Sequence, residues 1–203
     1  MDETTLLDSF HTIAYHLSEW VGALTLLNEF SIEDQVALFR QNFLALTWLH
    51  FSYRTYLSRQ EKIGLTLGNG ACIPYLNQAK EYLHVKWSKT YGVLAAKLIE
   101  TIVHPMIATQ LDSDEYAILK AFALFAVDSQ LSEDGLQRSA DIRETLSKAL
   151  YVHIERRLHP CDPLHITQRI ARLTLLLPPL IVLHWNTIVI PDSVLYKYPT
   201  VVV

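Results

Sequence analysis

The chain has 203 residues, of which 50% are hydrophobic and 19% are charged, and its formal net charge is −4. This balance predicts a folded domain with a sizeable core, and it argues against direct contact with nucleic acid or an anionic membrane. Cys72 and Cys161 are its only cysteines, which excludes a disulfide framework or a cysteine-rich zinc module and predicts a reducing compartment.

The N-terminal segment, from Thr4 to about Phe30, is predicted to form one amphipathic helix. Apolar residues recur along it at steps of three and four, and together they form one stripe: Ile13, Leu17, Trp20, Leu24 and Leu27. The beginning of the chain has neither a basic region nor a long apolar core, so we expect no signal peptide.

A second helix is predicted from Val36 to about Leu57. Ser31 and Asp34 precede it with the spacing of a capping box in which Asp replaces the usual Glu. Its apolar residues point in nearly all directions, which is typical of a helix in the middle of a domain. Arg54, near its C-terminal end, either reaches solvent or a carboxylate, or anchors a small polar group.

A small hairpin is predicted after the second helix. Apolar residues alternate from Ile63 to Leu67 and are followed by Asn69-Gly70. Asn-Gly pairs supply the positive φ angles that a tight turn needs, so this segment indicates two short antiparallel strands. Helices are predicted to resume from about Tyr75, which leaves the hairpin as the only expected sheet.

Later helices are marked by capping and breaking residues. Asp112 and Glu115 have the spacing of a capping box. Ser132 begins a loop into a helix expected over about 136–158, and two prolines, at positions 160 and 163, end that helix.

The last predicted element is a long helix that begins near Leu164. It includes the longest apolar run, Leu173 to Leu183, which is too short to span a bilayer and contains Pro178 and Pro179. No internal repeat or low-complexity linker is visible, so we expect a single domain over residues 1–203.

An ordered set of motifs resembles the ligand-binding domain of nuclear hormone receptors. The family signature is an aromatic residue, spaced apolar positions, an Asp-Gln pair and two more apolar residues. It is matched here by Trp20-Val21-Gly22, Leu27, Phe30, Asp34-Gln35 and Leu38-Phe39. Motifs of the fifth, eighth, ninth and tenth family helices follow in family order: Phe51-Ser52-Tyr53-Arg54, Glu115-Tyr116, Arg143-Glu144 and Leu177-Pro178-Pro179-Leu180. The Asp-Gln pair alone is weakly specific, whereas the ordered set, from about Phe10 to Leu183, is strongly specific.

The resemblance implies an all-α fold, a three-layer antiparallel helical sandwich with one small β-hairpin. By comparison with the family, we expect the chain to lack the first helices and the zinc-finger DNA-binding domain, for which two cysteines are too few. The implied activity is regulation of transcription in the nucleus, without catalysis or a cofactor. A lipophilic ligand shifts the population of a C-terminal helix, which completes a groove for a coregulator helix.

The resemblance also assigns ligand-contacting positions. Arg54 matches the family position that binds the carboxylate or carbonyl of a ligand, and a guanidinium suits bidentate capture of an acid such as a fatty acid. The expected ligand-binding residues are Phe10, Ile13, Thr47, His50, Phe51 and Arg54. Bulky side chains at several of these positions leave open a second interpretation, in which side chains fill the pocket.

The implied coregulator groove departs from the family pattern. Gly22 stands where family members commonly have a basic residue, whereas Arg40 matches a second basic position. Val194 and Leu195 belong to a short apolar segment that resembles the activation helix of the family. Lys197, however, stands near the position where that helix usually has an acidic residue. A C-terminal tail that simply packs or frays is the alternative.

Glu115 and Arg169 match a structural pair that braces the eighth helix of the family against the ninth and tenth. We expect this pair to stabilise the domain modestly and to act mainly on specificity. A ligand-independent module, which forms homodimers or heterodimers with other receptors through the helix 169–183, is the alternative function.

A histidine-rich segment lies outside the family pattern. His153, His159, Cys161 and His165 include zinc-ligand types, but their spacing matches no common zinc module, so an exposed loop is favoured and no metal site is assigned. The chain also lacks a nucleophile elbow and a glycine-rich phosphate loop, which disfavours an enzyme.

Overall fold

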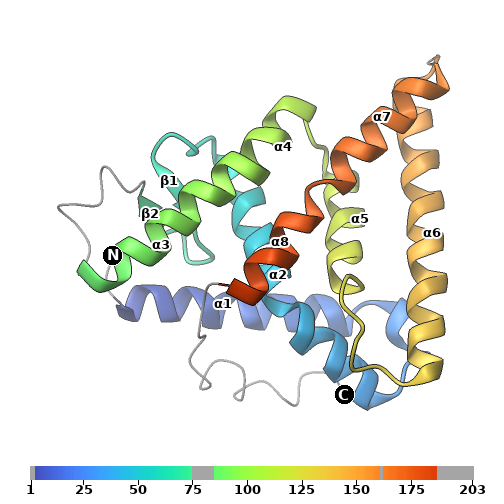
Figure 1. Cartoon of the computed structure of the whole chain (residues 1–203), viewed down its shortest axis with the longest axis horizontal. Helices are drawn as coiled ribbons and strands as arrows, with labels where there is room; N and C mark the ends of the chain where they lie inside the picture. Colours follow the sequence, from blue (N-terminus) through green and yellow to red (C-terminus); the bar gives the residue numbers. More distant parts are fainter. Residues whose placement is uncertain (1–2, 75–84, 161, 187–203) are drawn as a thin grey trace.

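The computed structural model describes residues 3–74, 85–160 and 162–186, which form helices and one small sheet (Figure 1). The N-terminal half comprises α1 (Glu3–Gly22), a 3₁₀ helix η1 (Thr25–Leu27), α2 (Ile32–Ser58), β1 (Gly64–Thr66), β2 (Cys72–Pro74) and α3 (Val85–Leu98). The C-terminal half comprises a π-helical segment η3 (Ile99–Val103), α4 (His104–Thr109), α5 (Ser113–Leu124), α6 (Glu133–Leu158), α7 (Pro163–Thr174) and α8 (Leu177–Asn186).

The central element of the fold is α2. It packs against α1, α5, α8, β1 and η3, which explains why its apolar residues point in nearly all directions. The described helices form three layers: α1 is the first, α2, α5 and α6 are the second, and α3, α4, α7 and α8 are the third (Figure 1). The predicted all-α helical sandwich with one small hairpin is confirmed.

The first helix is shorter than the sequence predicts. It ends at Gly22 instead of continuing to about Phe30, because the backbone of Leu24 is extended and the 3₁₀ helix follows. The amide of Gln35 donates to the carbonyls of Leu27 and Phe30, at 3.1 Å each, and so satisfies polar groups that a continuous helix would have paired internally.

Only half of the predicted capping box at the start of α2 forms. Ser31 accepts a hydrogen bond from the backbone N–H of Asp34, but the Asp34 carboxylate binds Ser132 instead, at 2.8 Å from its N–H and 2.7 Å from its hydroxyl. Burial of this carboxyl opposes ionisation, but the hydrogen bonds from Ser132, together with that of Ser31, outweigh the effect of burial and lower the pKa of Asp34. Since Ser132 is the N-cap of α6, Asp34 links α2 to the start of α6.

The predicted hairpin is present and is fastened to α1. Its strands are antiparallel, with Leu65 opposite Ile73. Of the Asn-Gly pair, only Gly70 has a positive φ angle, of 84°, whereas the Asn69 side chain donates to the carbonyl of Thr5 in α1. The turn therefore fixes the hairpin beside the N-terminal part of the first layer.

The later boundaries are set by caps and prolines. Asp112 and Glu115 form the complete capping box predicted for α5. The predicted last long helix is wrong, since α7 ends at Thr174 and α8 begins at Leu177. Pro178 has no N–H, and its ring would clash with the carbonyl of Thr174 in a continuous helix, so α7 ends before it and Pro178 lies in the first turn of α8.

One helical stretch, Tyr91–Thr109, is long and apolar enough to cross a membrane by length and composition. A core helix of a folded domain passes the same test, and residues at helical spacing in this stretch belong to the core: Leu94, Leu98, Ile102 and Met106. Its apolar composition therefore follows from its place in the third layer.

Candidate functional site

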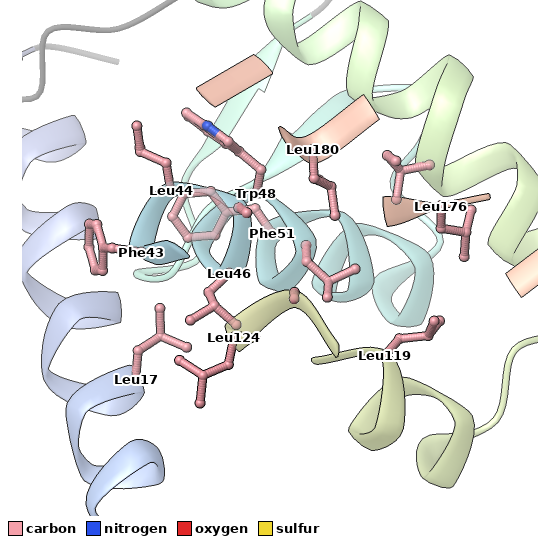
Figure 2. Close-up of a cluster of buried hydrophobic side chains, with 14 of the residues drawn as sticks. Leu17, Phe43, Leu44, Leu46, Trp48, Phe51, Leu119, Leu124, Leu176 and Leu180 are labelled. Carbon is pink, nitrogen blue, oxygen red and sulfur yellow. The ribbon is translucent and has the colours of Figure 1, made fainter. Parts of the chain in front are cut away.

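Three aromatic side chains from α1 and α2 meet in the middle of the predicted site. Phe10 lies edge-on to Trp48 and Phe51, with ring centroids 5.7 and 6.1 Å apart, and the Trp48 and Phe51 centroids are 5.7 Å apart. All three are buried, as is Ile13. Figure 2 shows Trp48 and Phe51 together with Leu44 inside the apolar core. These side chains therefore pack together and occupy much of the space between α1 and α2.

Two further residues predicted to bind a ligand, Thr47 and His50, carry polar groups. The Thr47 hydroxyl is buried and donates to the carbonyl of Phe43 at 2.8 Å, so its donor is already used. Burial, followed by the charges of Lys120, Arg54 and His16, lowers the pKa of His50 to about 4. His50 is therefore neutral at pH 7.

Arg54 is half-buried on α2 and lies one helical turn after His50. Its Nε atom is shielded from solvent and has no hydrogen-bond partner in the described part of the chain. No ion pair to its guanidinium occurs among residues 3–74, 85–160 and 162–186. A shielded donor without an acceptor is costly, and an acceptor brought by a ligand would remove that cost.

The predicted groove residues are only partly within the described chain. Gly22 is exposed at the C-terminal end of α1, and Arg40 is exposed on α2. Val194, Leu195 and Lys197 lie outside the described residues. Of the four residues predicted for the groove, Gly22 and Arg40 therefore lie on the first and second layers.

Glu115 and Arg169 lie together in a larger charged network. Arg169 donates to both carboxylate oxygens of Glu115, at 2.6 and 2.8 Å, and Arg157 donates to the same carboxylate at 3.0 Å. Arg157 also binds Asp112 at 2.7 Å, and the Asp112 carboxylate lies 3.0 Å from Nε2 of His153. The network joins α5, α6 and α7 through a carboxylate that has no exposed surface.

The same network contains residue types that can bind a metal ion, but its negative charges are already balanced by positive ones. Oxygens of Asp112 and Glu115 and a nitrogen of His153 lie within 4.8 Å of one another. The guanidinium groups of Arg157 and Arg169 supply the cations there, which makes a metal ion unnecessary. His159 and His165 are exposed, and Cys161 lies outside the described residues.

Sequence reasoning missed a second polar cluster, on the α5 side of α2. The Tyr116 hydroxyl lies 3.3 Å from Nδ1 of His50, and the Tyr116 ring stacks on Tyr53 with a centroid distance of 3.6 Å. The Lys120 ammonium lies 3.8 Å from the centre of the Trp20 ring. The available signal was a single lysine in the largely apolar run that follows Glu115 in α5, and this signal does not identify the helices that the lysine meets.

Comparison with known proteins places this geometry in a family. The family described as the ligand-binding domain of nuclear hormone receptor matches residues 1–190. The nuclear hormone receptor family member nhr-4 of Caenorhabditis elegans is 27% identical over 173 residues, which cover 85% of this chain and 33% of that protein. The chain thus spans about a third of the length of this relative. Together with the helical sandwich, the match shows that the chain belongs to the nuclear hormone receptor ligand-binding domain family, whose members regulate transcription and are generally not enzymes.

Proposed function

We propose that this chain is a ligand-responsive domain acting in the nucleus, and that it binds a lipophilic acid with its carboxylate on Arg54. The observation that carries the proposal is the shielded Nε of Arg54, which has no acceptor in the described part of the chain. A carboxylate accepts two parallel hydrogen bonds from a guanidinium, which are stronger than bonds between neutral groups. The ligand would then fix a coregulator groove that includes Gly22, Arg40, Val194 and Leu195.

The apolar part of such a ligand would lie along Phe51 and Thr47, one and two helical turns before the anchor. Since Phe10, Trp48 and Phe51 already contact one another, ligand entry requires at least one of these contacts to open. The energy needed to open them reduces the apparent affinity, and small or flexible acids are therefore favoured over rigid ones.

Replacement of Arg54 by Ala should remove the preference for acids. We expect wild type to bind oleate more tightly than oleyl alcohol, and R54A to lower that ratio by about 10- to 150-fold. This range corresponds to about 1.5–3 kcal/mol for hydrogen bonds to a charged group. Native mass spectrometry and calorimetric titration measure both affinities. Arg156→Ala, an exposed change on α6, is the control. An unchanged ratio in R54A, or no binding of either lipid by wild type, contradicts the proposal.

A second candidate function, dimerisation without a ligand, rests on the exposed apolar side chains of α7, α8 and the link between them. Leu175 is 67% exposed, and Leu164 and Val182 are also exposed. Beside Leu175 runs a groove of about 510 Å³, between η3 and α4 on one side and α7 on the other. Glu100 and Arg172 both line it and would supply opposite charges to a second copy.

Leu175→Glu should dissociate such a dimer without unfolding the domain. A buried carboxylate at the interface would lack a partner, so we expect the dissociation constant to rise by at least about tenfold. Sedimentation equilibrium measures it, and Val93→Glu, at an apolar residue of α3 that is 52% exposed, is the matched control. A wild-type monomer, or equal association of both variants, excludes this surface.

A further inference from the structure

A cationic notch lies where α1, α2 and α5 meet, beside the aromatic cluster, since the His50 ring centroid lies 6.4 Å from that of Phe51. The notch is defined by His16, Trp20, His50, Tyr116 and Lys120. Trp20 forms its apolar floor, with the Lys120 ammonium 3.8 Å above the ring centre. The Tyr116 hydroxyl holds one side of His50 at 3.3 Å. Three helices thus bring nitrogen-bearing groups to one place.

The described part of the chain supplies no carboxylate to this notch. No ion pair to Lys120 occurs within it, and Glu19, the acid next to Trp20, accepts a hydrogen bond of 2.6 Å from Tyr15 instead. Burial lowers the pKa of Lys120 to about 8, and no acidic neighbour compensates for this burial. The partly buried Lys120 ammonium therefore has no counter-charge in the described part of the chain, which is unfavourable until an anion arrives.

The hydrogen bond between Tyr116 and His50 leaves His50 with a donor of its own, in addition to the Lys120 ammonium. Burial raises the pKa of the Tyr116 hydroxyl, so this group is protonated and donates to Nδ1 of His50. A neutral imidazole that accepts at Nδ1 carries its proton on Nε2. Within the described part of the chain, the His50 Nε2–H and the Lys120 ammonium then both keep hydrogen-bond donors without an acceptor, and the charge of Lys120 acts on His50.

We propose that the notch of Trp20, His50 and Lys120 binds a carboxylate, with the Lys120 ammonium and the His50 Nε2–H as donors. Trp20 would pack against the apolar part of the same molecule. The site does not depend on the ligand assigned to Arg54. The carboxylate comes either from a free organic acid or from a glutamate or aspartate side chain of a polypeptide, and the chemistry of recognition is shared.

Thermal unfolding in benzoate and acetate, compared with chloride at equal ionic strength, tests the site. We expect a saturable rise in Tm with benzoate and a smaller one with acetate, because only benzoate also packs on Trp20. Lys120→Met should abolish the rise, and Lys120→Arg should keep it. Lys97→Met, at an exposed lysine of α3, should behave like wild type. Since Lys120→Met removes a poorly solvated charge, it should fold, which circular dichroism in chloride verifies.

The second arm distinguishes the source of the carboxylate. A blocked amphipathic helical peptide with glutamates, and its glutamine counterpart, are titrated by fluorescence anisotropy. Binding of the glutamate peptide alone, lost in Lys120→Met, assigns a polypeptide, whereas a response to benzoate alone assigns a free acid. The same benzoate response in Lys120→Met as in wild type, or no response to any of these probes, overturns the proposal. Oleate binding that depends on Arg54 should survive Lys120→Met.

Discussion

Replacing Glu115 by Ala should lower the free energy of unfolding by about 3–5 kcal/mol, the range for breaking a buried ion pair by removing one partner. The Glu115 carboxylate is fully buried and accepts from both Arg169 and Arg157. Without it the Arg169 guanidinium, whose side chain is only 15% exposed, is left without its counter-charge between α5 and α7. Such a loss is a large part of the about 5–15 kcal/mol that stabilises a typical domain.

Urea unfolding followed by circular dichroism measures this loss. Glu144→Ala is the control, because Glu144 forms an exposed ion pair with Lys148 on α6 and should contribute little. The double variant E115A/R169M should recover part of the stability, since it removes the unpaired charge together with the acid. If E115A unfolds at the same urea concentration as E144A, the network does not hold the three helices together.

Replacing Trp48 by Ala should cost about 3–5 kcal/mol and open the space that the aromatic cluster fills. Trp48 is 1% exposed and lies edge-on to Phe10 and Phe51. The cavity left behind would be lined by apolar side chains, and such cavities bind small apolar molecules. We therefore expect indole to raise the Tm of W48A and to leave that of wild type unchanged.

The same variant bears on the choice between the proposed functions. If the cluster restricts the ligand site, W48A should bind oleate more tightly than wild type while retaining the dependence on Arg54. Leu57→Ala, on the same helix at a residue that is 61% exposed, is the matched control for both measurements. Loss of oleate binding in a folded W48A would instead identify Trp48 as a direct ligand contact.

Local sequence patterns were sufficient wherever the cause of a structure is local. The capping box of Asp112 and Glu115 and the hairpin around Gly70 depend on residues a few positions apart, and both are present. The apolar periphery of α2 likewise indicated a central helix, because burial on all sides leaves no polar face. The local pattern was misleading at the predicted last helix, because the apolar spacing continues through Leu175 and Leu176, where the structure has a break between α7 and α8.

Contacts between residues that are far apart in the chain could not be predicted from local patterns. Asp34 has the spacing of a cap residue, yet its carboxylate binds Ser132, 98 positions later. The approach of Tyr116 and Lys120 to His50 and Trp20 depends on how α5 crosses α1 and α2. A helical repeat determines which residues share a face, but not which other helix that face meets.

The fold class and the family could be predicted from the chain alone, because periodicity, caps and an ordered set of motifs are properties of the sequence. The packing of Phe10, Trp48 and Phe51 against one another, and the shielding of the Arg54 Nε without an acceptor in the described part of the chain, depend on the three-dimensional arrangement. Shielding and pairing depend on all neighbouring helices at once. For the same reason, the cationic notch on the α5 side of α2 became visible only when three helices were placed together.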